Sequence, residues 1–421
     1  MKSQLDRHQL IGGAAALLLL LAACSGGESG TGVQANQTTV GEITGFGSVY
    51  VNGIKFNTDQ ATVEIDGIAA SENNLSVGMV ITVIGGVNSD GVNGTANTVS
   101  ARTEVEGLVW QNNIVSDGTI NVMGQLVHIS NDTKFKSEVG AIAVVTDLVA
   151  GDTIVQVSGF SDGQGNIYAT YVKATGSGSA SEVKLHGVIS NLDGDADSGS
   201  FNVGNISVTY DTTTVFEDFG GITNGGGLAN GIYVAVTSHN YAVAGAPVQA
   251  AEIGQEDLST AAGTELEMEG IVTDASNVAV GSGQFVLNGK AVNYDISTSF
   301  EGGVAMDISA GMKLEVHGVA HADGSILADE IDFRAESDTE IEGTVFSAGV
   351  NTLTITDGVD SVTVTVNQLT SYEDETDPNN RTFNFNDIME GMMIEAKYYT
   401  DPVSENNIAT SIEKVSAEPV M

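Results

Sequence analysis

The chain has 421 residues and a formal net charge of −41, because 55 Asp and Glu residues outnumber 14 Lys and Arg residues. Such a negative field repels nucleic acid and anionic headgroups, so the composition argues against a nucleic-acid-binding protein. Hydrophobic residues make up 41% of the chain, which is enough for packed cores, and 52 glycines predict many turns.

The first 23 residues have the three parts of a secretory signal. Lys2 and Arg7 make the start positive, Leu10 to Leu21 is apolar, and small residues follow. The apolar run is shorter than the ~20 residues that a stable transmembrane helix needs. The next residues, Leu21-Ala22-Ala23-Cys24, resemble the lipobox of bacterial lipoproteins. The resemblance implies cleavage before Cys24 and acylation of that residue, with palmitate among the acyl chains.

Cys24 is the only cysteine, so it cannot form a disulfide within the chain. A lone free thiol would be a liability in an oxidising, exported compartment, which also favours lipidation. Ser25 follows it, and in Gram-negative lipoproteins this resembles the outer-membrane destination. We therefore expect a lipid anchor in the bacterial outer membrane, with the protein facing the periplasm or the cell surface.

After the signal, the chain divides into a tether and five similar units. Residues 24–39 are rich in Gly, Ser, Thr, Asn and Gln, which predicts a flexible, lipidated tether. The predicted units are module 1 (residues 40–103), module 2 (104–178), module 3 (179–257), module 4 (258–336) and module 5 (337–421).

The units share patterns of strands and hairpins. We expect the opening strand of each to end on a glycine: Gly45, Gly107, Gly187, Gly270 and Gly343. The alternating residues 265–269 place Leu266 and Met268 on one face and glutamates on the other, which predicts a half-buried strand. Asn52-Gly53 and Asn288-Gly289 predict hairpin turns, because both residue types tolerate positive φ.

Three further marks recur. Thr-x-aromatic occurs at Thr133, Thr214, Thr298 and Thr370, although the first unit lacks it. A glycine enters an apolar alternating strand at Gly78, Gly151, Gly231, Gly311 and Gly391. The last mark, Ala-x-x-Val/Ile, begins at Ala96, Ala169, Ala250, Ala328 and Ala409. Together they predict five or six strands and little helix in each unit.

A unit of ~75 residues with five strands suits a small OB-type barrel. An immunoglobulin-like sandwich is the second choice, since it usually needs ~100 residues and seven strands. The marks resemble the domain-of-unknown-function family numbered 5666, found in tandem in bacterial exported lipoproteins. Residues 148–159 also resemble the periplasmic bacterial OB-fold family. These resemblances imply an all-β chain of five tandem OB-like barrels and offer no chemistry.

Catalytic patterns are poorly supported, and we expect no enzyme. The histidines after residue 24 are interpreted as strand-face residues, and His317 and His321 lack an evident third metal ligand. Asp193, Asp195 and Asp197 are the best metal candidates, because alternating Asp residues in one loop can converge on Ca²⁺. The alternative is a solvated turn, where Asp and Gly are favoured. No other cofactor is expected.

The sequence favours a lipid-anchored cell-envelope protein with a non-catalytic binding or structural role. Its expected partners are the membrane, through the anchor, and an envelope protein or an extracellular polysaccharide. Two alternatives stay open. One is a Ca²⁺-stiffened, adhesin-like surface stalk. The other is an envelope enzyme or enzyme accessory with one differentiated module.

Overall fold

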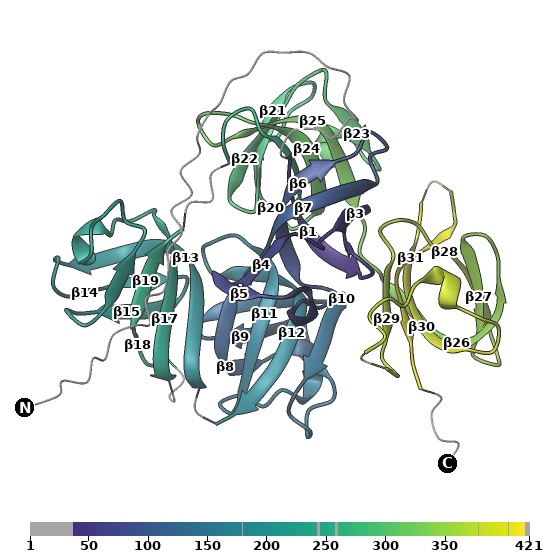
Figure 1. Ribbon diagram of the computed structural model, residues 1–421, viewed down its shortest axis with the longest axis horizontal. Coiled ribbons are helices and arrows are strands. Elements are labelled where there is room, and N and C mark those ends of the chain that lie inside the picture. The colour runs from purple at the N-terminus through teal and green to yellow at the C-terminus, as the bar shows by residue number, and fades with distance from the viewer. Residues whose placement is uncertain are drawn as a thin grey trace, which may run out of the picture. The chain divides into compact units, whose positions relative to one another are not determined.

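Five small closed β-barrels make up the computed structural model (Figure 1). The structure describes residues 37–178, 180–241, 245–256, 260–377, 379–402 and 404–416. In module 4, strand β20 pairs with β21, β21 pairs with β22, and β22 lies parallel to the last strand, β25. Strand β24 pairs with both β25 and β20, which closes the barrel. This is the OB-type strand order, and the prediction of an all-β chain of OB-like modules is confirmed.

The strands follow one plan in every module. Module 1 contains β1 (Gln37–Gly45), β2 (Val49–Val51), β3 (Ile54–Asn57), β4 (Thr62–Ile65), β5 (Ile68–Ala70), β6 (Val80–Val87) and β7 (Asn93–Ala101). Module 2 contains β8 (Val105–Asn112), β9 (Thr119–Val122), β10 (Gln125–Ser137), β11 (Thr153–Ser161) and β12 (Asn166–Ser177). Strand β1 begins at Gln37, three residues before the predicted start of module 1 at residue 40.

Modules 3 to 5 repeat this plan. Module 3 contains β13 (Ala180–Gly194), β14 (Gly199–Val203), β15 (Ile206–Tyr210), β16 (Val215–Glu217), β17 (Tyr233–Tyr241), β18 (Val248–Gln249) and β19 (Glu252–Gln255). Module 4 contains β20 (Glu265–Asn277), β21 (Gly283–Leu287), β22 (Lys290–Tyr294), β23 (Ser299–Glu301), β24 (Lys313–Ala320) and β25 (Ile326–Arg334). Module 5 contains β26 (Thr339–Ala348), β27 (Thr352–Thr356), β28 (Ser361–Thr365), β29 (Ser371–Asp374), β30 (Met393–Thr400) and β31 (Asn407–Lys414).

Within the described residues, helical structure is confined to single turns. They are η1 (Glu72–Asn74), α1 (Ile114–Asp117), η2 (Val145–Asp147), η3 (Gly225–Gly227), η4 (Ala305–Asp307) and η5 (Phe385–Asp387). The five 3₁₀ turns stand between the third and fourth barrel strands and end on a buried apolar residue: Leu75, Leu148, Leu228, Ile308 or Ile388. Within the residues that the structure describes, no helix has the length and apolar character needed to cross a membrane.

The recurring threonine lies at a break in the third barrel strand and links it to the last strand of the same barrel. In module 4 the third barrel strand is interrupted between β22 and β23, and Thr298 lies at the break. Its hydroxyl accepts from the Asp295 amide at 3.0 Å and donates to the Ala328 carbonyl at 2.8 Å. Thr133, Thr214 and Thr370 donate in the same way to Ala169, Ala250 and Ala409. The threonine and alanine marks are therefore the donor and the acceptor of one hydrogen bond that recurs in modules 2 to 5.

The second recurring glycine fixes the start of the fourth strand. Gly78, Gly151, Gly231, Gly311 and Gly391 all have positive φ, between 79° and 91°. Each amide donates to an opening-strand carbonyl at 2.8–2.9 Å, from Ile43, Val109, Ile189, Val272 and Val345 respectively. The mark is thus a left-handed turn that returns the chain to the first strand and closes the barrel.

One expectation about the opening strands is wrong. In modules 2 to 5 these strands run through the first recurring glycine instead of ending there. Strand β20 pairs with β24 as far as Ile271 and with β21 from Val272, so it bends next to Gly270. A Cβ at Gly270 would lie 2.2 Å from Nδ2 of Asn288 in the crossing hairpin turn. The glycine marks this close approach within a continuous strand.

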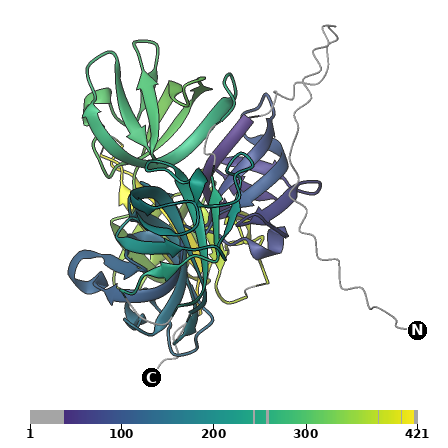
Figure 2. The same cartoon turned by 90° about the vertical axis from the view of Figure 1, so that its left-hand side faces the viewer.

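Contacts between modules extend the sheets. Strand β1 pairs in parallel with β20, and β8 pairs antiparallel with β13, so modules 1 and 4 share a sheet, as do modules 2 and 3 (Figures 1 and 2). One hydrophobic cluster runs from module 2 into module 3, while modules 1, 4 and 5 have separate cores. All five modules belong to one compact unit. Modules distant in sequence are therefore in direct contact.

The threonine bridge can be tested with Thr298→Val, which keeps the side-chain shape. We expect this change to lower the free energy of unfolding by about 1–3 kcal/mol, because the buried Ala328 carbonyl and the Asp295 amide lose their partner. Denaturant unfolding measures the loss. The control is Thr363→Val, on an exposed strand position, which should change stability by less than about 0.5 kcal/mol. Equal effects of the two substitutions would contradict the bridging role.

Candidate functional site

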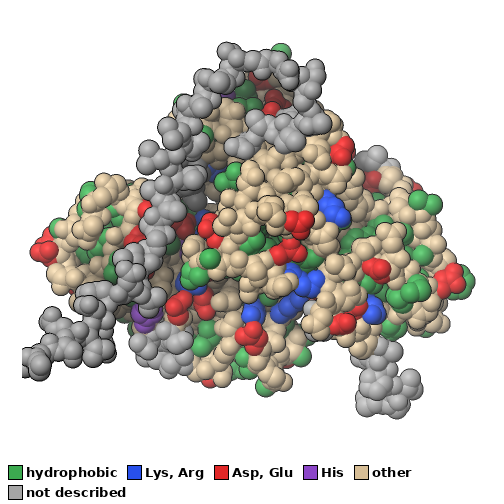
Figure 3. Space-filling model, in the orientation of Figure 1, with side chains coloured by type: hydrophobic (Ala, Val, Ile, Leu, Met, Phe, Trp, Pro, Cys, Tyr) green, Lys and Arg blue, Asp and Glu red, His purple; other side chains and the backbone are tan. Residues whose placement is uncertain are grey.

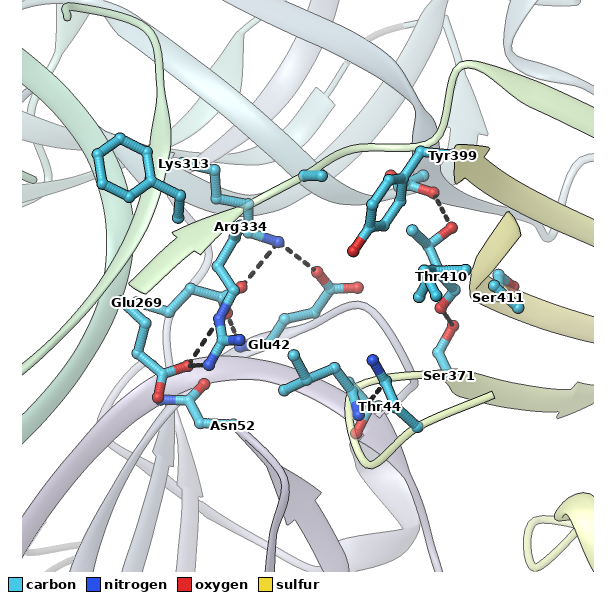
Figure 4. Close-up of a pocket in the computed structure, with 18 residues that line it drawn as sticks. Glu42, Thr44, Asn52, Glu269, Lys313, Arg334, Ser371, Tyr399, Thr410 and Ser411 are labelled. Atoms are coloured by element: carbon cyan, nitrogen blue, oxygen red, sulfur yellow. Dashed lines mark hydrogen bonds and ion pairs between the residues drawn. The ribbon is translucent and has the colours of Figure 1, made fainter. Parts of the chain in front are cut away.

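A polar cavity of about 110 Å³ lies where modules 1, 2, 4 and 5 meet. Its walls carry carboxylates, cations and hydroxyl groups from strands far apart in the sequence (Figure 4). The lining includes Glu42, Asn52, Asp132, Glu269, Lys313, Glu315, Arg334, Tyr399, Thr410 and Ser411. A cavity of this size holds a few water molecules or a small ion, and is below the ~300–1,000 Å³ typical of ligand pockets.

Lys313 links modules 4 and 1 across this cavity. Its Nζ lies 2.8 Å from Oε1 of Glu269 and 3.3 Å from Oε2 of Glu42 (Figure 4). Burial alone would lower the pKa of Lys313, but the attraction of Glu269 and Glu42 outweighs burial and raises it. Burial also raises the pKa of Glu42, to about 7 against the pull of Lys313. The ammonium group is therefore held charged between two carboxyl groups from different modules.

Asp132 joins module 2 to the segment that enters module 5. Its carboxylate accepts from the Ser337 amide and hydroxyl, both at 2.8 Å, and from the Thr410 hydroxyl at 2.7 Å. All three donors lie more than 200 positions from Asp132 in the chain. One side chain of module 2 thus fixes two separate segments.

A buried cation lies beside Asp132 in the sequence. Lys134 is only 4% exposed, and its ammonium group forms an ion pair with Glu413 and donates to the Ser411 hydroxyl. Burial raises the pKa of Glu413, but the charges of Lys134 and Lys397 outweigh burial and hold it at about 2. Lys136 forms a second ion pair with Glu373 of module 5. The second and fifth modules are therefore joined by paired charges.

Two more cations cross between modules elsewhere. Lys184 of module 3 lies 2.8 Å from Asp66 of module 1. Arg102 of module 1 lies 2.7 Å from Glu104 and 3.1 Å from Glu256, in modules 2 and 3.

Arg381 of module 5 binds module 1 without a carboxylate. Its guanidinium donates to the carbonyls of Glu72 and Leu75, each at 2.9 Å, and stacks 3.8 Å from the Phe46 ring centroid. The guanidinium thereby caps the end of the η1 turn, where the Glu72 carbonyl also accepts from the Leu75 amide.

The distribution of the basic residues follows from these contacts. Of the 14 Lys and Arg residues, two lie within the first 23 residues. At least six of the other twelve, all within the described ranges, reach into another module. On the face shown in Figure 3, basic side chains are few and acidic ones are scattered. The scarce cations of this acidic chain are concentrated at module contacts.

Glu267 and Glu269 of β20 are buried, which corrects the prediction that residues 265–269 form a half-buried strand. Glu267 and Glu269 do point away from Leu266 and Met268, but they are only 2% and 8% exposed. The glutamate face of β20 is covered by module 1, through Gln37 and the Glu42 amide. Alternation shows the two faces of a strand, but it cannot show that a second barrel covers the polar face.

Two acidic clusters in module 4 bring potential metal ligands together. In each, one ligand atom from each residue lies within 4.8 Å of the others. The first contains Glu267, Glu315 and His317, and the second contains Glu301, Glu330 and Asp332. His317 therefore has carboxylate neighbours that sequence spacing did not reveal, because Glu267 comes from the adjacent strand β20. His321 lies in the turn after β24.

The predicted site residues lie elsewhere. Cys24 falls outside the described residues, and its lipidation stays a prediction. Asp193, Asp195 and Asp197 are exposed at the β13–β14 turn. Oδ1 of Asp195 accepts from the amides of Asp197 and Ser198, and these hydrogen bonds lower the pKa of its carboxyl group. Asp195 thus closes its own turn, and Ca²⁺ binding there stays a prediction.

The Lys134–Glu413 pair should make stability depend on pH. We expect Glu413→Gln to lower the free energy of unfolding by about 3–5 kcal/mol at pH 7, because Lys134 loses its anion. The carboxylate has a folded pKa of about 2, below its ordinary value of 4.5, so its contribution is full above that ordinary value and falls as pH drops toward 2.

The difference between wild type and Glu413→Gln should therefore shrink by about 2 kcal/mol from pH 7 to pH 3, as measured by urea unfolding. Glu340→Gln, at an exposed position of β26, is the matched control and should show little effect at either pH. A difference that stayed constant down to pH 3 would contradict the pairing.

Two solved structures show a remote likeness to the chain. Drosophila Unr CSD456 is 10% identical, with a TM-score of 0.13, and the match covers 55% of this chain and 97% of that chain. A multidomain protein with nucleic acid binding domains from Streptococcus pneumoniae TIGR4 is 11% identical, with a TM-score of 0.14, and the match covers 56% and 75%. No curated protein matches the chain. These TM-scores say nothing about what the chain binds.

A family model gives a direct assignment. The domain of unknown function DUF5666 matches residues 38–99, 106–173, 186–253, 269–332 and 342–413. Each match falls on one barrel, and together they span most of the chain. The protein therefore belongs to the DUF5666 family and carries five copies of its domain in tandem.

Proposed function

We propose that this protein is a lipid-anchored component of the cell envelope with a non-catalytic binding or structural role. We further propose that its five modules act as one scaffold instead of five independent units. The observation that carries the proposal is the placement of at least six of the scarce cations at contacts between modules. A chain of independent modules would have no need of buried charge pairs between units distant in sequence.

The chemistry of the polar cavity where modules 1, 2, 4 and 5 meet, and of the charge pairs around it, supports a structural role. Its ammonium and guanidinium groups are already paired with carboxylates, and Asp132 already accepts three hydrogen bonds. Groups held in this way fix positions and are poorly placed to exchange protons with a substrate. The small cavity likewise suits bound water better than a reacting molecule.

The acidic exterior is consistent with the proposed setting. A net charge of −41 with paired cations at module contacts leaves an excess of carboxylates toward solvent. Such a surface would be repelled by anionic headgroups and needs another means of attachment to a membrane. The lipobox-like segment ending at Cys24 would supply it, since two or three acyl chains anchor far more firmly than one. The expected partners are an envelope protein or an extracellular polysaccharide.

The anchor is tested by Cys24→Ala in intact cells and in membrane fractions. We expect the wild-type chain to remain with the outer membrane and the variant to be released in soluble form, because no acyl chain can be attached. Ser25→Ala is the control and should not release the protein. Membrane association that survives Cys24→Ala would overturn the lipid anchor, and protease treatment of intact cells would show which side the wild-type protein faces.

The scaffold is tested by Lys313→Met, which removes the cation between Glu42 and Glu269. We expect a loss of about 3–5 kcal/mol and new protease cleavage in the connection between modules 4 and 5, because two carboxylates are left buried without a counter-ion. Limited proteolysis with mass spectrometry locates the cuts.

The matched control is Lys173→Met, whose partner Glu138 lies in the same module and is well exposed. That pair should contribute less than about 1 kcal/mol, so the proteolytic pattern should stay that of the wild type. Identical behaviour of the two variants would contradict the scaffold.

A further inference from the structure

We propose that Glu267, Glu315 and His317 of module 4 form a binding site for one divalent transition-metal ion of the Zn²⁺ class. The three side chains come from two paired strands, β20 and β24, whose register sets Glu267 opposite His317. Glu315 lies two residues before His317 on the same face of β24, so its carboxylate falls on the same side. The ligand atoms lie within 4.8 Å of one another.

An unpartnered buried oxygen points to a missing ligand. The Glu267 side chain is only 3% exposed, and its Oε1 atom has no hydrogen-bond partner among the described residues. A buried carboxylate oxygen without a donor is costly, and such groups in native structures call for an explanation such as a bound ion. A metal held by the Glu267 carboxylate would lower that cost, because Oε2 of the same group already lies 3.9 Å from Nδ1 of His317.

The neighbours of the three ligands hold them in place. Arg334 donates to Oε2 of Glu315 through Nε at 3.1 Å and Nη2 at 2.5 Å, which leaves Oε1 directed to His317 Nε2 at 2.8 Å. Gln37 of module 1 donates to Oε2 of Glu267 at 3.1 Å. Partners of this kind orient metal ligands and tune their affinity. The contact from Gln37 would couple metal binding to the contact between modules 1 and 4.

Charge and access both favour a cation. Two carboxylates face one guanidinium, so with a neutral imidazole the cluster has one negative charge in excess. His317 is 37% exposed while both glutamates are buried, so an ion would enter from the histidine side. Two oxygens and one imidazole nitrogen suit Zn²⁺, Mn²⁺, Fe²⁺ or Co²⁺, and three protein ligands leave positions for water. The site goes beyond the anchoring and structural role proposed above.

A second arrangement competes with metal binding. A protonated His317 would itself act as the cation between Glu267 and Glu315, because burial lowers the pKa of His317 but the Glu315 hydrogen bond and the Glu267 charge outweigh it and raise it to about 9. The two arrangements differ in a measurable way, since only one of them retains a metal.

The test uses Co²⁺ as a spectroscopic probe of the full-length protein in detergent, after chelator treatment and in excess Mg²⁺. The Mg²⁺ occupies exposed carboxylates that bind hard cations weakly. We expect one equivalent of Co²⁺ with visible ligand-field bands, displaced by one equivalent of Zn²⁺. Both His317→Gln and Glu267→Gln should weaken binding by at least about tenfold.

Two matched substitutions separate this site from general acidity. Glu330→Gln changes the other acidic cluster, and His321→Gln changes the nearby turn, so neither should alter the bands or the stoichiometry. Circular dichroism and unfolding midpoints check each fold. His317→Gln decides the test if Glu267→Gln does not fold, because His317 is partly exposed.

The absence of stoichiometric Co²⁺ bands in the wild-type protein would overturn the site and assign the cation role to protonated His317. Binding that survives His317→Gln, or that is lost in Glu330→Gln, would also overturn it.

Discussion

The structure depends on a small number of buried cations placed between carboxylates of different modules. Lys313 lies between Glu42 and Glu269, and Lys134 is paired with Glu413. Pairs of this kind need not stabilise more than well-packed apolar residues would, but losing one partner is costly. Their effect is therefore to favour the barrel contacts in which each buried cation meets its carboxylates, since separating a pair leaves a buried charge without its partner.

This arrangement changes how a tandem repeat of this kind is understood. Within a repeat, the same hydrogen bonds recur, from the threonine at the broken third strand to the glycine at the start of the fourth. The contacts between repeats that the structure describes use different residues, for example Lys184 with Asp66, and Arg381 with the carbonyls of Glu72 and Leu75. The repeats share a fold, while their differences determine the assembly. Buried pairs are also screened by salt less than exposed pairs.

The fold could be predicted from the sequence because its strongest signals are local. A left-handed glycine, an Asn-Gly hairpin and a threonine that bonds its own strand each depend on a few neighbouring residues, and five copies repeat the signal. The turn Met123-Gly124 escaped notice because methionine rarely marks a hairpin, although both residues adopt positive φ there as Asn52-Gly53 does. The wrong expectation at Gly270 also comes from a purely local signal. In sequence, a glycine at a close approach to another segment looks the same as a glycine that ends a strand.

By itself, the sequence determined the five-fold repeat and the barrel class, because these rest on composition and on spacing along the chain. The export signal and the lipidation of Cys24 stay predictions. Only the tertiary structure decided which polar residues are buried. Glu267 and Glu269 look like solvent-facing positions of an alternating strand, yet module 1 covers them. His317 gains the Glu267 carboxylate from strand pairing, and Asp132 and Lys134 meet Thr410 and Glu413 across more than 270 positions. Side-chain periodicity reports the two faces of a strand, whereas burial of the polar face depends on a second surface that the local pattern does not encode.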